Sequence, residues 1–368
     1  MILRSAAGGQ FLILARGLLE IGRSMWLRLF RLIKEGTIAT ADQLRIPQAL
    51  HRFALRESLS ILMYHAVVRA HLPVTDWCFV DEGSFRRQML YLMRQFHVVP
   101  LEQAVTLLKR RQIVRPTAVI TFDDGFQNVF ETAFPILHEL RLPCTIFLTT
   151  SLLGTKDTIW FARLHDAVSS AAKSTLSLQG RTLDLSSPFA RSRASATVQT
   201  FLKELPVQEL RSTMQVIMKE LEYDIEKPLP EGSPYRILDA LSIRTMVDSG
   251  LVEFGGHTAN HSILSKLAPQ DAELEIHHCL AHVSRLTGKP CRLFAYPNGR
   301  AVDYNENIVR MLERHGVVAA VTTIMGPNLT ETPRLELRRY GVGAFFSDAR
   351  YRALIHHFLW YLSRKGTS

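Results

Sequence analysis

Cysteine is scarce in this chain, and a long uncharged apolar run is missing. Only four of the 368 residues are cysteines, and no two of them have the Cys-x-x-Cys spacing. A disulfide framework and a cysteine-based zinc site are therefore not expected. The N-terminal region also lacks the roughly 20 consecutive apolar residues that a transmembrane helix needs. Its short apolar piece, residues 11–15, is interrupted by Arg16 and precedes no clear cleavage site, which gives no support for a secretory signal.

Sequence signatures of nucleic-acid recognition are absent as well. The chain nevertheless has a net charge of +10, so an anionic partner is expected. Nucleic acid, an anionic membrane and an acidic glycan all fit this charge. Nucleic acid is the least favoured, because no helix-turn-helix, zinc-finger or aromatic RNA-binding pattern occurs.

Both ends of the chain have amphipathic character. In residues 1–50, apolar side chains such as Leu14 and Leu18 recur at helical spacing, and arginines fall on the opposite side. Residues 349–368 repeat this pattern. Basic amphipathic helices suit the interface of an anionic membrane, so we expect peripheral membrane contact. The alternative is that the N-terminal segment packs on the protein body as a cap.

Two adjacent carboxylates are the most informative feature of the sequence. Asp123 and Asp124 end the apolar run 118–120, and Gly125 follows them. An apolar run bounded by turn residues predicts a buried strand, and loops after strands carry catalytic groups in α/β folds. Neighbouring carboxylates raise each other's pKa, and a bound cation relieves this repulsion. The alternative interpretation is ordinary Asp-Gly turn chemistry.

A pair of histidines points to the same chemistry. His257 and His261 follow the apolar run 251–254 and are four residues apart. On one helical turn this spacing places both imidazoles on one face, where they can reach a single ion. Two histidines and one aspartate with an open position are typical of a catalytic zinc site. The pair alone could be a surface accident, but together with the two aspartates it favours a metal site.

These motifs resemble those of a known family. Thr121-Phe122-Asp123-Asp124-Gly125 and His257-Thr258-x-x-His261 are similar to motifs of the polysaccharide deacetylases, the carbohydrate esterase group with a NodB-like domain. A weaker third resemblance is Phe294-Ala295-Tyr296-Pro297-Asn298-Gly299. The similarity extends from about residue 60 to about residue 343.

The resemblance implies a role for each matched residue. Asp123 is expected to be the general base, and a divalent metal, with Zn²⁺ the expected ion, is expected on Asp124, His257 and His261. The substrate groove is expected to be lined by Tyr296, Pro297 and Asn298, with a backbone N–H near Asn298 binding the oxyanion.

The chain departs from the family pattern at two roles. Many members carry an arginine at the position of Ala295, where it orients the base, and Arg339 is our candidate replacement. A late histidine that acts as the general acid also has no clear counterpart. Tyr64-His65-x-Val67 resembles a segment of the circularly permuted branch in which the histidine is the acid, so His65 is our candidate. Other available histidines are His315, His356 and His357.

Alternating strand and helix patterns predict an α/β fold with parallel strands. The strand candidates are Ser60–Val67, Ala118–Phe122, Cys144–Thr149, Val252–Gly255, Arg292–Ala295, Val317–Thr322 and Leu335–Val342. A helix over 126–140 is expected to break near Pro135, and one over 269–286 to stop at Gly288. Periodicity leaves an open sheet or a barrel, and the resemblance implies an irregular (β/α) barrel of about seven strands, over residues 58–348.

One region exceeds a minimal barrel. Residues 151–234 form an insertion between the two metal motifs, with helical patterns near 198–205 and 209–222. The insertion either shapes the substrate groove or is a peripheral decoration. Trp160 and Phe161 either stack on a sugar ring or anchor the insertion in the core.

The sequence thus predicts a hydrolase of carbon–nitrogen bonds other than peptide bonds. We expect metal-dependent removal of N-acetyl groups from amino sugars of a polysaccharide or a lipid-linked glycan in a cell-envelope pathway. Alternatives are a deacylase such as a deformylase of a lipid-linked sugar, and a non-catalytic glycan-binding or membrane-adaptor relative. We expect the protein in the cytoplasm or on the inner face of the cytoplasmic membrane, with an exported form as the alternative.

Overall fold

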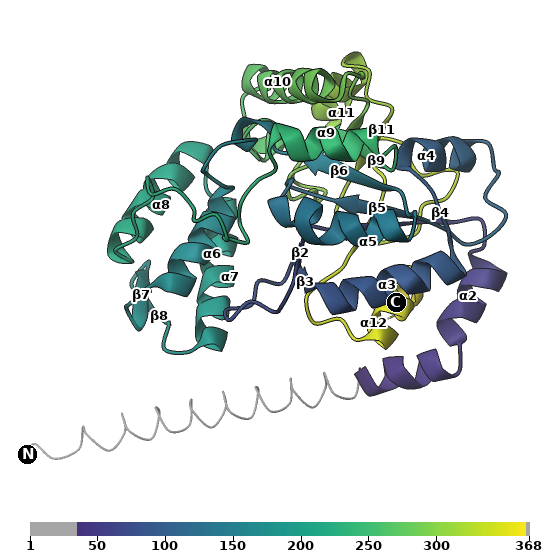
Figure 1. Ribbon diagram of the computed structural model, residues 1–368, viewed down its shortest axis with the longest axis horizontal. Coiled ribbons are helices and arrows are strands. Elements are labelled where there is room, and N and C mark those ends of the chain that lie inside the picture. Colours follow the sequence, from purple (N-terminus) through teal and green to yellow (C-terminus); the bar gives the residue numbers. More distant parts are fainter. Residues whose placement is uncertain (1–34, 366–368) are drawn as a thin grey trace, which may run out of the picture.

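A mostly parallel sheet forms the centre of the computed structural model, which describes residues 35–365 (Figure 1). Its strands run in the order β11-β10-β9-β6-β5-β1-β12, with β4 beside β5, and each of these pairs is parallel. The bounds are β1 Leu59–Tyr64, β4 His97–Val98, β5 Thr117–Phe122, β6 Cys144–Leu148, β9 Val252–Gly256, β10 Leu293–Ala295, β11 Ala319–Val321 and β12 Tyr340–Gly341. Every predicted strand region overlaps one of them.

The segment before β12 draws the two edges of the sheet together. Leu337 forms a parallel bridge with Val321 of the edge strand β11, and its N–H donates to Ala320 O at 3.0 Å. Three residues later, Tyr340 pairs with Leu62 of β1 at the opposite edge. This connection curls the sheet into the irregular (β/α) barrel that the resemblance implied.

Successive side chains of each strand alternate between an inner and an outer hydrophobic core. Ile61 and Val119 pack with alternate residues of the other strands and with helix α4 (Leu101–Lys109). Their neighbours Leu62 and Ile120 belong to the larger cluster formed with the surrounding helices. Since side chains of successive strand residues point to opposite faces, the smaller cluster fills the barrel.

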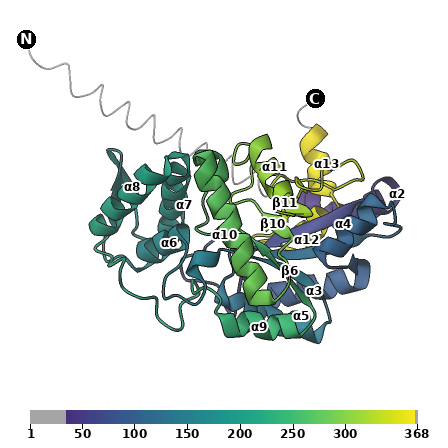
Figure 2. The same ribbon diagram turned by 90° about the horizontal axis from the view of Figure 1, so that it is seen from above.

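The outer layer consists of helices placed around the sheet (Figures 1 and 2). They are α3 Glu82–Gln95, α5 Phe134–Glu139, α9 Ala240–Asp248, α10 Pro269–Thr287 and α11 Glu306–Arg314. As predicted, α10 stops at Gly288, whose φ of 71° lies in the left-handed region that glycine favours. The predicted break near Pro135 is present as a π-helical turn, Val129–Ala133, immediately before α5.

The insertion is a helical unit with a small hydrophobic core of its own. It contains α6 Trp160–Ser170, the antiparallel hairpin β7 Thr175–Leu178 and β8 Arg181–Asp184, α7 Pro188–Glu204 and α8 Val207–Glu220. Buried residues such as Leu164, Val198 and Ile217 form its core. In Figure 1 it lies to one side of the barrel, beyond β2 Ala66–Val68 and β3 Phe79–Asp81.

The C-terminal end of the chain differs from the predicted amphipathic segment. Residues 1–34 lie outside the described part. Residues 349–368 were expected to form a single amphipathic helix, but the structure has two, α12 Asp348–Ile355 and α13 Phe358–Lys365. The first packs its apolar residues, including Tyr351 and Ile355, into the main core, because α2 (Ile46–Ala54) and α3 cover it. Among the helices of residues 35–365, none has the length and apolarity to cross a bilayer.

Candidate metal and catalytic site

Three strands of the central sheet deliver the predicted residues to one end of the barrel. His65 follows β1, Asp123 and Asp124 follow β5, and His257 follows β9. In the sheet, β1 lies next to β5, and β6 alone separates β5 from β9. The carboxyl ends of parallel strands share an edge, which is where barrel enzymes place their reactive groups.

Asp124, His257 and His261 form a compact buried triad. Asp124 Oδ1 lies 3.5 Å from His257 Nε2 and 3.3 Å from His261 Nε2. One ligand atom of each residue lies within 4.8 Å of the other two. Among the described residues, this is the group of histidine, cysteine and acidic side chains that could hold a metal ion. Both oxygens of Asp124 are buried, and neither has a hydrogen-bond donor within residues 35–365. Such a carboxylate is costly unless it is paired, so the donor set fits a divalent cation.

The two histidines lie on a loop, which corrects the helical turn used to predict their proximity. Thr258 and His261 have φ values of 62° and 55°, and Asp124 has 74°. Non-glycine residues in this left-handed region are strained, and such strain concentrates at functional sites. Nδ1 of His257 lies 2.7 Å from the carbonyl oxygen of Ala295. With the ring donating there, Nε2 carries the lone pair that faces Asp124 and His261.

Asp123 is held by an arginine that is wholly buried. Nη1 and Nη2 of Arg339 donate to the two Asp123 oxygens, each at 2.7 Å. Arg339 also donates to Thr322 O at 2.8 Å, so the guanidinium is fixed from more than one side. Burial alone would raise the pKa of Asp123, but the charges of Arg339 and then of His257 outweigh it and hold this pKa below its ordinary value. The carboxylate is therefore ionised at neutral pH and able to accept a proton.

His65 lines the same pocket as the metal triad. This pocket has a volume of about 370 Å³, and Asp123, His257, His261 and Asn298 are also in its lining. His65 Nδ1 is buried with no hydrogen-bond partner among the described residues, and the ring packs on Trp77 with 5.4 Å between centroids.

The other candidate histidines lie elsewhere. His315 contacts Glu273 at 3.1 Å beyond the end of α11. His356 and His357 are buried against His51 of α2 and are not part of the pocket lining.

The third motif contributes less side-chain surface to the pocket than expected. Tyr296 is 1% exposed, its hydroxyl donates to Leu335 O at 2.8 Å, and its ring stacks on Tyr304. Its expected place in the groove is thus corrected, because its side chain fills the core. Pro297 is also buried. Asn298, at a φ of 58°, does line the pocket.

Trp160 lines a second pocket, of about 190 Å³, that adjoins the first. Its ring packs edge-on against Phe161, which in turn lies 5.3 Å from the His261 ring. The tryptophan therefore both anchors the insertion and contributes to a cavity wall.

The insertion supplies site residues that sequence reasoning missed. From α7, Gln199, Thr200, Lys203 and Glu204 line the metal pocket. The helical pattern of the sequence predicted a helix in this region, but it did not indicate which face of the helix packs against the barrel. The helical spacing of Thr200, Lys203 and Glu204 is the one signal in the sequence that could have grouped them.

Comparison with known proteins agrees with these motifs. The sequence model of the family "Polysaccharide deacetylase" matches residues 111–320. A curated protein, "Putative polysaccharide deacetylase YxkH" of Bacillus subtilis, is 24% identical over 128 residues, which are 34% of this chain and 43% of the relative. The chain thus spans less than half the length of this curated relative.

Solved structures show the same fold at low sequence identity. The Streptococcus pyogenes deacetylase PplD in complex with acetate has a TM-score of 0.55 and 17% identity, over 81% of this chain and 98% of that one. The Bacillus cereus polysaccharide deacetylase BC0361 has a TM-score of 0.53 and 19% identity, over 82% of this chain and 70% of that one. IcaB from Ammonifex degensii has a TM-score of 0.52 and 16% identity, over 82% of this chain and 96% of that one. With a family match over residues 111–320, the chain belongs to the polysaccharide deacetylase family.

Proposed function

We propose that the protein is a metal-dependent N-deacetylase of acetamido sugars in a glycan. The observation that carries this proposal is the pairing of an ionised, arginine-held Asp123 with the Asp124, His257 and His261 triad in one pocket. A carboxylate that is ready to accept a proton beside a cation site is the arrangement that hydrolysis of an unactivated amide requires.

The triad would hold Zn²⁺, since two imidazoles and one carboxylate leave an open position. When bound, the ion polarises the acetamide carbonyl and lowers the pKa of a water molecule. Asp123 takes a proton from the attacking water as its oxygen adds to the carbonyl carbon. Arg339 fixes both oxygens of Asp123 throughout.

The remaining steps use the pocket wall. As the carbon–nitrogen bond breaks, His65 gives a proton to the leaving nitrogen, and acetate and a free amine are released. A backbone N–H near Asn298 stabilises the oxyanion that forms on the carbonyl oxygen, an effect worth on the order of 3 kcal/mol per donor in enzymes of known mechanism.

Two alternatives remain distinguishable by experiment. Removal of formyl or another acyl group from a lipid-linked sugar would use the same residues. The purified protein, stripped by chelation and reloaded with Zn²⁺, can be assayed for acetate and formate from matched N-acetyl and N-formyl amino sugars. Zinc-dependent acetate release supports the proposal, and formate release alone would replace it. Absence of turnover would favour a glycan-binding or adaptor relative.

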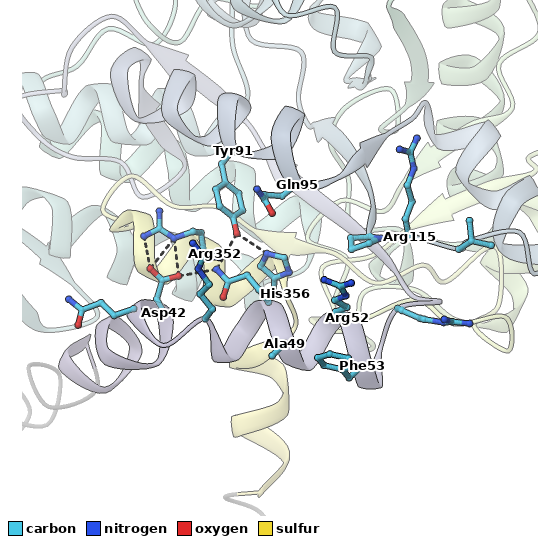
Figure 3. Close-up of a pocket in the computed structure, with 15 residues that line it drawn as sticks. Asp42, Ala49, Arg52, Phe53, Tyr91, Gln95, Arg115, Arg352 and His356 are labelled. Atoms are coloured by element: carbon cyan, nitrogen blue, oxygen red, sulfur yellow. Dashed lines mark hydrogen bonds and ion pairs between the residues drawn. The ribbon is translucent and has the colours of Figure 1, made fainter.

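We further propose peripheral contact with an anionic membrane through the end of the barrel opposite this site. A cleft of about 1030 Å³ lies there between α2, the end of α3 and residues 114–116 (Figure 3). Arg115 precedes β5, and Asp123 follows it, so the cleft and the catalytic pocket lie at opposite ends of that strand.

The charge and exposure of this end support the membrane proposal. Segments 44–57 and 109–116 contain one acidic residue, Glu57, and the exposed cations Arg45, Arg52, Arg56, Lys109, Arg110, Arg111 and Arg115. Phe53 and Val114 are 82% and 78% exposed beside them. Cations interleaved with exposed apolar side chains are suited to the interface of an anionic bilayer. The proposal includes a location on the inner face of the cytoplasmic membrane.

A further inference from the structure

The insertion brings a lysine to the junction of two pockets. Lys203 lies near the end of α7 and lines both the metal pocket and the adjoining pocket of about 190 Å³. His261 and Asn298 also line both of them, so the pockets meet beside the metal triad. A substrate that reaches the triad therefore has room to extend past Lys203.

The ammonium group of Lys203 is attracted by the carboxylates of Asp76 and Asp124 but forms no ion pair with either of them. Arg300, the other insertion-facing cation of the metal pocket, is paired with Asp303 at 2.9 Å and with Glu204 at 3.6 Å. Within residues 35–365, by contrast, no side chain forms a hydrogen bond or an ion pair with the half-buried Lys203 ammonium. A partly desolvated cation without a partner is unfavourable, and an anionic ligand would remove that cost.

The adjoining pocket has the composition of a site for an anionic sugar. It is lined by three cations, Lys203, Arg211 and Lys266, and by no acidic residue among those described. Lys266 Nζ donates to the carbonyl oxygen of Lys203, which fixes the end of α7. The half-buried ring of Trp160 and the side chain of Leu210 supply apolar surface. Sugar rings present apolar C–H faces that pack on aromatic rings, and the carboxylate or phosphate groups of acidic sugars bind cations.

We propose that this pocket binds an acidic sugar residue next to the acetamido sugar, with Lys203 and Arg211 contacting its carboxylate or phosphate. The inference rests on the deacetylase function proposed above and names its substrate class as an acidic N-acetylated glycan. Both anions form strong charge-assisted hydrogen bonds with lysine and arginine. The same cations repel the ammonium group that deacetylation creates, which favours release of the product.

Binding can be measured without turnover in an Asp123→Asn background. Calorimetric titrations would compare three tetrasaccharides in which N-acetylglucosamine alternates with glucuronic acid, with a glucose 6-phosphate unit, or with glucose. We expect at least one acidic compound to bind about tenfold more tightly than the neutral one. Lys203→Gln should abolish this preference. Lys219→Gln, which removes an exposed charge of α8 outside both pockets, should preserve it.

The outcomes separate this inference from the deacetylase proposal. Preference for the glucuronate compound alone identifies a carboxylate as the anion, and preference for the phosphate compound alone identifies a phosphate ester. Equal affinity for all three compounds, or a preference that survives Lys203→Gln, would overturn the inference. Acetate release by the wild-type protein is scored separately, so a lack of turnover would contradict the proposed function while leaving the binding result interpretable.

Discussion

Arg339 and Asp123 form a two-bond ion pair inside the barrel, with both N–O distances at 2.7 Å. Ala295 stands where the motif resemblance implies a base-orienting arginine, and its backbone carbonyl lies 2.7 Å from Nδ1 of His257. Arg339, in the segment that leads into β12, holds Asp123 instead. It donates to Thr322 O as well, so the segment that closes the barrel also orients the candidate base.

Replacing Arg339 should impair turnover more than metal binding. Arg339→Lys keeps the charge but loses the planar two-bond contact, so we expect kcat to fall about tenfold to a hundredfold with zinc content unchanged. Arg339→Ala should also destabilise the fold by about 3–5 kcal/mol, because Asp123 becomes an unpaired buried charge.

Steady-state kinetics, metal analysis and urea unfolding would measure these effects. Arg334→Lys is a matched control, because its pair with Glu313 is exposed and worth little. Equal effects of Arg339→Lys and Arg334→Lys would argue against a role for Arg339 in positioning the base.

His65→Ala should lower the rate of hydrolysis most for substrates whose leaving group must be protonated. Departure of an amine requires a proton, whereas 4-nitrophenolate leaves without one. We expect deacetylation of an amino sugar to fall by about a hundredfold and hydrolysis of 4-nitrophenyl acetate to change little. His315→Ala, outside the pocket, serves as the control. An equal loss on both substrates would assign His65 a structural role.

Acid should weaken the attachment of α2 to the barrel before it affects exposed regions. His51 Nδ1 lies 3.0 Å from His356 Nδ1, and His356 Nε2 lies 2.9 Å from the hydroxyl of Tyr91. Burial lowers the pKa of His51 to about 4 and that of His356 to about 3. Because the unfolded chain binds protons first, their contribution to stability is complete above about pH 6.5 and is lost progressively as the pH falls from there towards the folded pKa values.

Urea unfolding between pH 7.5 and 4.5 would measure this loss. The shift of His51 corresponds to at most about 3 kcal/mol. His51→Phe should reduce the pH dependence, since a neutral ring then occupies the site. An unchanged dependence in this variant would show that other groups determine acid stability.

Vesicle binding tests the proposed membrane contact. The full chain should sediment with phosphatidylglycerol vesicles and not with phosphatidylcholine vesicles, and added salt should weaken the association. Arg52→Glu/Arg115→Glu should lower the affinity at least about tenfold, since each cation near an anionic surface contributes about 1 kcal/mol.

The control makes the same change in charge elsewhere. Arg181→Glu/Arg244→Glu alters two exposed arginines away from the cleft and should have a smaller effect. Equal losses of affinity in the two double variants would show that vesicle binding depends on the overall charge of the protein and not on this cleft. Unchanged binding in the first variant would assign any membrane contact to another part of the chain.

Local patterns determined how much of this structure was predictable. The buried strands and Asp123, Asp124 and His257 at their ends follow from apolar runs bounded by turn residues. The helical turn proposed for His257 and His261 was wrong, because the required loop depends on left-handed φ values at Thr258 and His261 that residue type alone does not indicate.

Features that depend on tertiary packing could not be deduced. The burial of Tyr296 results from Tyr304 and Leu335, which lie outside its motif. Lys203 reaches the site only because the insertion docks with one particular face of α7 toward the barrel. The sequence predicted the insertion without this orientation.

The central claim is that Asp124, His257 and His261 hold a catalytic metal. The most direct test is the metal content of the purified protein and of a His257→Ala/His261→Ala variant, with acetate release from N-acetylated oligosaccharides measured on the same samples. We predict close to one zinc per chain in the wild type, and loss of both zinc and acetate release in the variant. Zinc retained by the variant, or acetate released without a bound metal, would contradict this account.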